Sequence, residues 1–182
     1  MNAILARDKN NLIGSGGSLP WKDDPSARWD MESFKHLTSG NIVFMGYRTF
    51  LGFKSPLPGR INVVETKNPA ERLARQELAS SDGTAASSFI FASSLQNFLE
   101  SYKNELETIW RGKKIFIIGG AATIAKYADK ISCLYLTTFS KTYKGDVFLP
   151  KDFQEILARR FTLCQTAEAH SNGKIEIYKS LA

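Results

Sequence analysis

The chain has 182 residues, 43% hydrophobic and 23% charged, which is typical of one globular domain and argues against disorder. No apolar run approaches the ~18 residues that cross a bilayer, and the N-terminus lacks the pattern of a signal peptide, so we expect a cytoplasmic protein with no membrane partner. The net charge is +6, but the cations are scattered, and with two histidines and two distant cysteines we expect neither nucleic acid nor a metal as partner.

Short apolar segments alternate with longer amphipathic ones as far as Thr138. Six short segments, rich in Ile, Val and Phe, predict strands: Asn2–Ala6, Ile42–Gly46, Ile61–Glu65, Ser88–Ala92, Lys114–Ile118 and Ser132–Thr138. Five longer segments predict helices: Arg28–Thr38, Tyr47–Phe53, Ala70–Leu78, Leu95–Trp110 and Ala121–Ala128. Strand–helix alternation, with several strands apolar on nearly every residue, indicates a mostly parallel sheet covered on both faces.

The C-terminal segment has a different pattern. Arg160–Gln165 and Lys174–Lys179 predict two strands, and the Asn172-Gly173 pair between them is a hairpin signal. We therefore predict a single α/β domain over residues 1–182, with a mostly parallel central sheet flanked by helices and a C-terminal antiparallel hairpin.

A glycine-containing loop, Gly14–Trp21, follows the first predicted strand. Its three glycines allow close approach to a ligand, and its end presents Leu19 and Trp21 beside Pro20. Such a loop suits a lid over a flat ring, but composition alone equally describes an ordinary surface loop with a Trp packed on the core.

The predicted helix Arg28–Thr38 carries an acid on its apolar side. With about 100° per residue, Phe34 lies about 40° and Met31 about 100° from Asp30 on the helical wheel. A buried lone carboxylate is unfavourable unless it is paired or neutralised, which indicates a ligand that donates hydrogen bonds. The alternative is an acid placed in the first turn by the helix dipole or as a cap, and the pattern does not separate the two.

Three further segments follow predicted strands or turns. Gly119-Gly120 joins a strand to a helix start, an arrangement that brings N–H groups to an anion, although a glycine pair is a weak signal. Arg48 and Thr49 begin another helix, and Arg60 follows a Pro-Gly turn. Arginine binds carboxylates and phosphates in bidentate fashion, but a solvated surface charge is the commoner role.

In order and spacing, these segments resemble dihydrofolate reductase from Asn2 to Pro150. The loop and the Pro56–Arg60 turn are the specific signals. The full set of matching segments is Ile13–Trp21, Asp30–Thr38, Met45–Thr49, Pro56–Arg60, Ile118–Gly120, Leu134–Thr137 and Gly145–Pro150.

The resemblance implies that NADPH gives a hydride to the pterin ring of 7,8-dihydrofolate, forming tetrahydrofolate. Asp30, supported by Thr137, would accept hydrogen bonds from the pterin, and burial would raise its pKa. Water near Trp21 would deliver the proton, and Leu19 belongs to the loop that would close over the site. The implied substrate contacts, besides Asp30 and Thr137, are Ile4, Ala6, Met31, Phe34 and Phe53 around the rings and Arg60 on the glutamate carboxylate.

The implied cofactor site lies on the first strand, the loop and three strand ends. Its residues near the first strand are Ala6, Ile13, Gly14, Ser18 and Leu19. Those expected around the 2′-phosphate and nearby phosphates are Arg48, Thr49, Thr66 and Lys67. Those at the pyrophosphate and the helix after it are Gly119, Gly120, Ala121, Ala122, Thr123 and Ile124. Two departures concern the phosphates: Tyr47 stands where many members have a basic residue, and Glu65 would repel a phosphate if it faced one.

The resemblance also implies antifolates such as methotrexate or trimethoprim as ligands, and a monomer. The nearest alternative is an NADPH-dependent pyrimidine reductase of riboflavin biosynthesis, which shares the fold; Asp30 and Arg60 speak against it. A non-catalytic basic protein that binds nucleic acid is a second alternative, motivated only by the charge.

Overall fold

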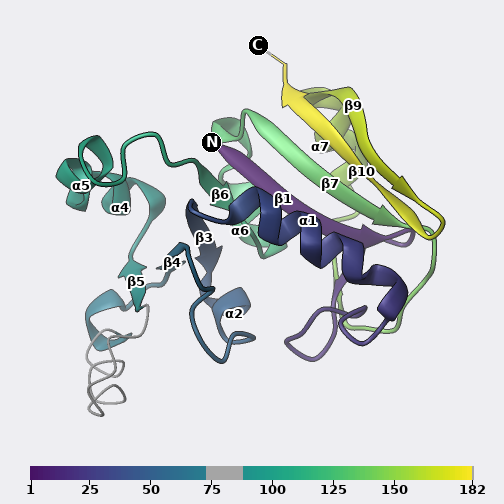
Figure 1. The fold of residues 1–182 in the computed structure, drawn as a ribbon, viewed down its shortest axis with the longest axis horizontal. Coiled ribbons are helices and arrows are strands. Elements are labelled where there is room, and N and C mark those ends of the chain that lie inside the picture. Colours follow the sequence, from purple (N-terminus) through teal and green to yellow (C-terminus); the bar gives the residue numbers. More distant parts are fainter. Residues whose placement is uncertain (73–87, 182) are drawn as a thin grey trace.

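The structure is a computed structural model that describes residues 1–72 and 88–181, apart from the side chains of residues 168 and 169. Its centre is an eight-stranded sheet (Figure 1). The strands in spatial order are β5 (Phe89–Ala92), β4 (Ile61–Glu65), β3 (Ile42–Gly46), β6 (Ile115–Ile117), β1 (Asn2–Asp8), β7 (Cys133–Phe139), β10 (Gly173–Ser180) and β9 (Phe161–His170). Neighbours are parallel from β5 to β7, and β10 pairs antiparallel with both β7 and β9, which confirms the predicted fold class.

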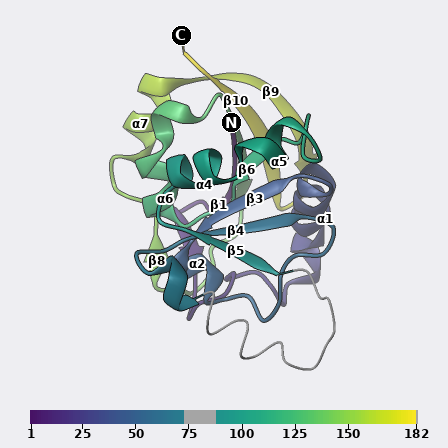
Figure 2. The same cartoon turned by 90° about the vertical axis from the view of Figure 1, so that its left-hand side faces the viewer.

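Helices cover both faces of the sheet (Figure 2). One face carries α1 (Arg28–Thr38). The other carries α4 (Leu95–Ser101), α6 (Ala121–Lys126) and α7 (Phe153–Arg160), whose apolar side chains form the main core with those of β1, β3 and β7. The remaining helices are α2 (Tyr47–Phe50), α5 (Lys103–Glu107) and two short 3₁₀ turns, Pro25–Ala27 and Ala128–Lys130. The central strands are apolar on both faces because both faces are covered.

Strand register brings the functional segments together. In the β3–β4 pair, Gly46 lies opposite Glu65, so the residues that follow these strands leave the sheet side by side. In the β1–β7 pair, Ala6 lies opposite Thr137. Because alternate residues point to opposite faces, both side chains lie on the α1 face, away from the main core that contains Leu5 and Leu136.

The predicted helix Leu95–Trp110 is wrong in one respect, since the structure has two helices there. The chain leaves helical geometry at Tyr102, with φ −115° and ψ 27°. The ring of Tyr102 packs on Phe98 and on Trp110, with centroids 5.4 and 5.5 Å apart, and this stacking folds the second segment back. Local periodicity does not encode such a contact.

Other elements were outside the prediction. Strands β2 (Leu12–Gly14) and β8 (Val147–Phe148) form a separate two-stranded sheet and are too short to show a pattern. Helix α7 does carry the signal of Phe153, Ile156 and Leu157 at helical spacing. Residues 69–72 are helical, but the rest of the predicted helix Ala70–Leu78 lies outside the described residues.

Candidate active site

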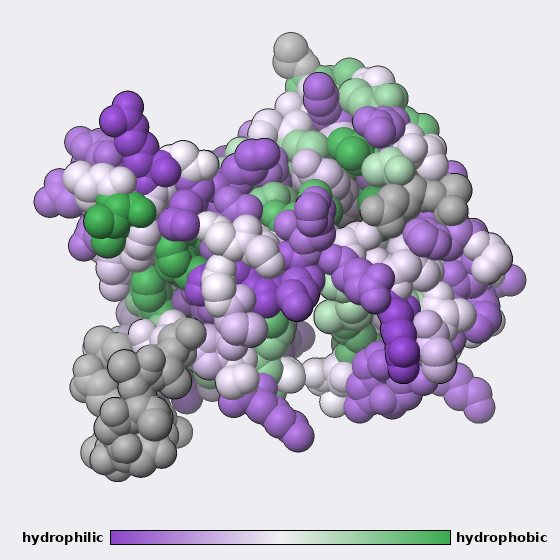
Figure 3. Space-filling view, in the orientation of Figure 1, coloured by the Kyte–Doolittle hydropathy of each residue, from purple (hydrophilic) through white to green (hydrophobic). Residues whose placement is uncertain are grey.

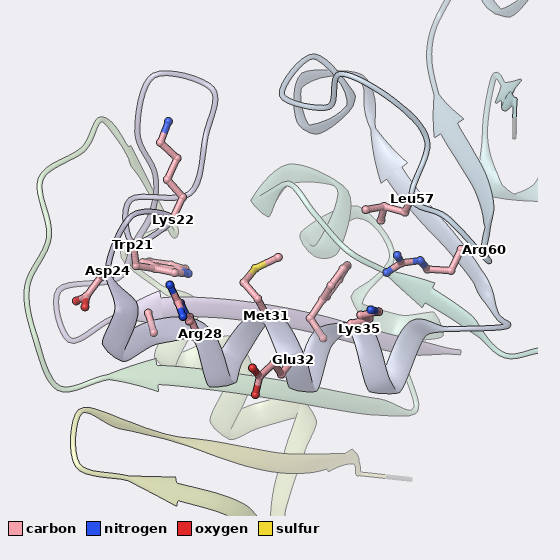
Figure 4. A pocket seen from close by; sticks show the side chains of 11 residues that line it. Trp21, Lys22, Asp24, Arg28, Met31, Glu32, Lys35, Leu57 and Arg60 are labelled. Carbon is pink, nitrogen blue, oxygen red and sulfur yellow. The ribbon is translucent and has the colours of Figure 1, made fainter. Parts of the chain in front are cut away.

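A cavity of about 380 Å³ opens on the α1 face of the sheet. Figure 3 shows the surface hollowed there, with hydrophobic side chains inside and hydrophilic ones at the rim. In Figure 4, Trp21 and Lys22 lie on one side, Leu57 and Arg60 on the opposite side, and Met31 points up from α1 between them. The lining residues are Trp21, Lys22, Asp24, Ala27, Arg28, Met31, Glu32, Phe34, Lys35, Leu57 and Arg60.

Helix α1 carries Asp30 next to Met31, which lines this cavity. The side chain is only 7% exposed, whereas its neighbour Met31 is 44% exposed and lines the cavity. Burial raises the pKa of the Asp30 carboxyl to about 6, although hydrogen bonding by the Thr137 hydroxyl and the proximity of the Trp21 indole oppose the shift. Asp30 can therefore be protonated or ionised near neutral pH, as a carboxyl that exchanges hydrogen bonds with a ligand requires.

Trp21 is fixed by aromatic packing. It is 1% exposed, and its ring lies 4.7 Å from that of Phe139 and 5.7 Å from that of Tyr143. Its Nε1 is buried and makes no hydrogen bond with any described residue, although it lies near enough to Asp30 to lower the pKa of that carboxyl. A buried N–H without an acceptor is unfavourable, which makes this atom a place for a ligand or water oxygen.

Trp21→Phe is expected to raise the pKa of Asp30, because the indole is one of the two groups that lower it. The ring of Phe preserves the contact with Phe139, so the fold is retained. The pH at which Asp30 titrates can be followed by carboxyl NMR, and an unchanged or lower value would contradict the assignment.

Arg60 faces the cavity from the turn before β4. Its Nη1 donates to Thr38 Oγ1 at 3.1 Å, its Nε donates to the Pro58 carbonyl at 3.1 Å, and its guanidinium lies 5.9 Å from the centre of the Phe34 ring. Burial lowers the pKa of this guanidinium, and no acidic side chain in the described part of the chain pairs with it. An anionic ligand would relieve this unfavourable burial.

The predicted loop is a tight turn anchored at both sides. Ser15 and Ser18 exchange two backbone hydrogen bonds of 2.9 Å around Gly16 and Gly17, whose φ angles of +55° and +80° favour glycine. The Asp146 carboxylate accepts a 2.9 Å bond from the Gly16 N–H, and the turn also reaches the segment after α2. A Cβ on Gly52 would lie 2.3 Å from the Gly17 carbonyl oxygen.

Gly52→Ala is expected to push the loop away from its position, because two backbones meet where the methyl group would go. We expect faster proteolytic cleavage within residues 14–19 and a lower turnover number. Leu51→Ala, at the neighbouring exposed side chain, is the matched control and should change neither. Equal cleavage of all three proteins would contradict this contact.

Glycines at the carboxyl ends of β3 and β6, namely Gly46, Gly119 and Gly120, form a cradle. The Gly46 N–H donates to the Gly119 carbonyl at 2.9 Å, and a Cβ on Gly46 would lie 2.4 Å from Thr123 Oγ1. A Cβ on Gly120 would approach Thr49 Oγ1 to 3.3 Å. Helices α2 and α6 begin directly after Gly46 and Gly120, and the first turn of a helix leaves N–H groups free for an anion such as a pyrophosphate.

The end of β4 supplies cations without an opposing acid. Arg48 and Lys67 are exposed and pair with no acid among the described residues. Glu65 is held by Lys126 and by the Tyr127 hydroxyl, which donates at 2.7 Å. The sequence left open whether Glu65 would face a phosphate, and these partners hold it elsewhere.

The structure gathers most of the predicted residues around two spaces. Trp21, Met31, Phe34 and Arg60 line the cavity. Around it, Asp30 and Thr137 are buried, Ile4 and Ala6 are half-buried on the α1 face, and Phe53 is half-buried against an apolar cluster of β3 and β4. Among the residues predicted to hold the cofactor, Thr66 is buried, whereas Leu19 and Ala122 are exposed. Ile13, Gly14, Ser18, Thr49 and Ala121 are half-buried.

One predicted cofactor residue is buried in the core, and some residues that line the cavity were not predicted. Ile124 is 7% exposed and packs in the main core, so its role at a cofactor stays a prediction. The cavity is also lined by Arg28, Lys35 and Leu57, which the sequence argument did not name. The spacing of Arg28, Met31 and Lys35 along one stripe of α1 is a signal that could have found the first two.

Within residues 1–72 and 88–181, no helix is long and apolar enough to cross a membrane, and no three His, Cys, Asp or Glu side chains gather as metal ligands.

Comparison with known proteins decides the family. A model of the family described as dihydrofolate reductase matches residues 1–179. The chain belongs to the dihydrofolate reductase family. The pyrimidine reductase alternative is therefore not favoured.

Several relatives carry the same name. Dihydrofolate reductase of Lactococcus lactis is 30% identical over 151 residues, which are 82% of this chain and 77% of that protein. The bifunctional dihydrofolate reductase-thymidylate synthase of Paramecium tetraurelia is 34% identical over 175 residues, which are 94% of this chain and 32% of that protein. A solved dihydrofolate reductase from Enterococcus faecalis, complexed with NADP(H) and RAB-propyl, shares the fold with a TM-score of 0.71 at 24% identity, covering 98% of this chain and 95% of that one.

Proposed function

We propose that the protein reduces 7,8-dihydrofolate to 5,6,7,8-tetrahydrofolate with NADPH, and that Asp30 is the acid that holds the pterin ring. The observation that carries the proposal is a buried carboxyl with a pKa of about 6, next to Met31 and close to Trp21, which both line an apolar cavity. The family supports the reaction, and the position of Asp30 supports its place in the site.

The cavity suits the two ends of a folate. Its volume of about 380 Å³ falls within the usual range for small-molecule sites, and Met31, Phe34 and Leu57 offer apolar walls to flat rings. Basic residues outnumber acidic ones in its lining, with four of the former and two of the latter, which favours the anionic glutamate end. Arg60 binds the α-carboxylate, since its guanidinium is already oriented by Thr38.

The residues at the strand ends fit NADPH. At Gly46, Gly119 and Gly120 the two strand ends approach so closely that a side chain would meet Thr123 or Thr49, and the exposed Arg48 and Lys67 pair with no acid among the described residues. When bound, NADPH supplies the hydride that reduces the carbon of the pterin C=N bond.

The chain's own groups position the substrate and control the proton. The Asp30 carboxyl accepts hydrogen bonds from the 2-amino group and the adjacent ring nitrogen, which fixes the ring in its slot. The proton for the pterin nitrogen comes from water, and Trp21 Nε1, which has no acceptor among the described residues, offers that water a hydrogen bond beside Asp30. The turn at Gly16–Gly17 closes the site against further water.

The test is the loss of NADPH absorbance with dihydrofolate present. We expect turnover that methotrexate inhibits competitively against dihydrofolate, and trimethoprim is a second antifolate to compare. Turnover with a phosphorylated ribosylaminopyrimidine, together with none above background with dihydrofolate, would identify the pyrimidine reductase instead. A cytoplasmic location and a monomeric state stay predictions, which cell fractionation and size-exclusion chromatography check.

A further inference from the structure

Arg72 presents a cation that pairs with no acid among the described residues. Its guanidinium lies 4.5 Å from the centre of the Tyr47 ring, and its Nε is buried with no hydrogen-bond partner among the described residues. The backbone holds it in place, because the Arg72 N–H donates to the Asn68 carbonyl and the Asn68 N–H donates to Thr66 Oγ1. Arg72 thus lies seven residues beyond Glu65, the last residue of β4.

The nearby acids are not its partners. The carboxylate of Glu65 is bound by Lys126 and Tyr127, and that of Glu71 accepts from Asn68 Nδ2 at 3.4 Å. No ion pair joins Arg72 to a carboxylate in the described part of the chain. The ring of Tyr47 occupies one face of the guanidinium, and the buried Nε has no acceptor among the described residues. An oriented and partly desolvated cation of this kind favours an anionic ligand.

The sheet places this cation next to the glycine cradle. The cradle lies at the ends of β3 and β6, and Tyr47 and Thr66 lie at the ends of β3 and β4. Since β3 is the strand common to both pairs, Arg72 lies on the side of the cradle away from β1 and the cavity. A dinucleotide with its pyrophosphate in the cradle and its nicotinamide toward the cavity would extend its adenosine end in this direction.

We propose that Arg72, stacked on Tyr47, binds the 2′-phosphate of NADPH together with Lys67 and thereby sets the preference for NADPH over NADH. The inference rests on the proposed function for the identity of the dinucleotide. The position after Gly46 carries no charge in this chain, and Tyr47 acts there as the platform that orients a cation from a different helix.

Direct binding separates the phosphate contact from catalysis. Dissociation constants of NADPH, NADH, adenosine 2′,5′-bisphosphate and adenosine 5′-phosphate are measured by calorimetry. Arg72→Gln is expected to weaken the two 2′-phosphorylated ligands by about 10- to 100-fold, the range for lost charged hydrogen bonds, and the other two by less than about twofold. Arg72→Lys keeps the charge but loses the bidentate guanidinium, so its affinity for the two 2′-phosphorylated ligands should lie between those of the natural protein and Arg72→Gln. Tyr47→Leu removes the ring on which Arg72 stacks, and we expect an intermediate affinity for this variant as well.

The controls keep the two proposals apart. Arg111→Gln removes an exposed arginine that has no place in the site, and it should bind all four ligands as the natural protein does. If Arg72→Gln binds NADPH with an affinity within about twofold of that of the natural protein, the inference is overturned. If that variant still reduces dihydrofolate, the proposed function is unaffected. Selective loss of adenosine 2′,5′-bisphosphate affinity, in a protein that does not reduce dihydrofolate, supports the inference and overturns the function. If Arg72→Gln does not fold, Arg72→Lys decides by the same ratio of affinities.

Discussion

Replacing Asp30 by Asn is expected to lower the turnover number for dihydrofolate by about 100-fold or more at neutral pH, the usual range for loss of a positioned acid or base. The amide keeps the shape of the carboxyl but cannot ionise or accept hydrogen bonds from the pterin at both oxygens. The loss should grow as pH rises, because at high pH the substrate ring is rarely protonated without an acid to favour that form. Initial rates across a pH series test this, and natural turnover in the variant would show that Asp30 is not the acid.

The same substitution is expected to stabilise the fold above pH 6. Burial raises the pKa of Asp30 from 3.8 to about 6, so the folded state holds this proton more tightly than the unfolded state does. The free energy of unfolding therefore falls as pH rises between these two values and levels off above them. A shift of this size corresponds to at most about 3 kcal/mol. Asn does not titrate, and the variant should lack this fall.

Urea unfolding at pH 5 and pH 8 measures the effect. The exposed acid Asp129 gives the control, since Asp129→Asn should keep the pH dependence of the natural protein. An equal decline in Asp30→Asn would mean that another group titrates. A stabilised but inactive variant would show that the buried carboxyl serves ligand binding and lowers the free energy of unfolding. Such a trade-off between stability and activity is common at functional sites.

The wheel position of Asp30 was predictable because helical periodicity is a local property. The sequence placed it on the apolar side of Arg28–Thr38, and the structure has that helix with the same bounds and the acid buried. The composition likewise predicted the strands with continuous apolar runs, such as Ile42–Gly46. These features depend on residues within a few positions of each other.

What the sequence did not predict depends on contacts between distant segments. Glu65 turns toward Lys126 and Tyr127, which lie about sixty positions away, and no local pattern encodes that choice. The stacking of Arg72 on Tyr47 joins two helices on neighbouring strands. Both contacts involve the predicted phosphate site. The sequence therefore predicted the surroundings of that site less completely than the helix that carries Asp30.

Arg60→Gln is expected to raise the KM for dihydrofolate by about 100-fold, as loss of a bidentate charged pair implies, while the turnover number changes little. The reason is that Arg60 lies at the rim of the cavity, beside Phe34 and Thr38 and opposite Trp21, where we expect it to contact the glutamate rather than the reacting ring. Arg60→Lys keeps the charge but not the bidentate guanidinium, so it should retain part of the affinity for dihydrofolate that Arg60→Gln loses. Lys35→Gln removes one charge from the same rim and should have a much smaller effect.

A truncated substrate makes the assignment specific. Dihydropteroate carries the pterin and benzoyl groups but no glutamate, so the natural protein should bind it weakly and Arg60→Gln should bind it equally weakly. If Arg60 acted by supporting the fold through Thr38, the substitution would affect both substrates alike. A KM increase limited to dihydrofolate therefore separates a carboxylate contact from a structural one, because only a direct contact disappears with the group that it binds.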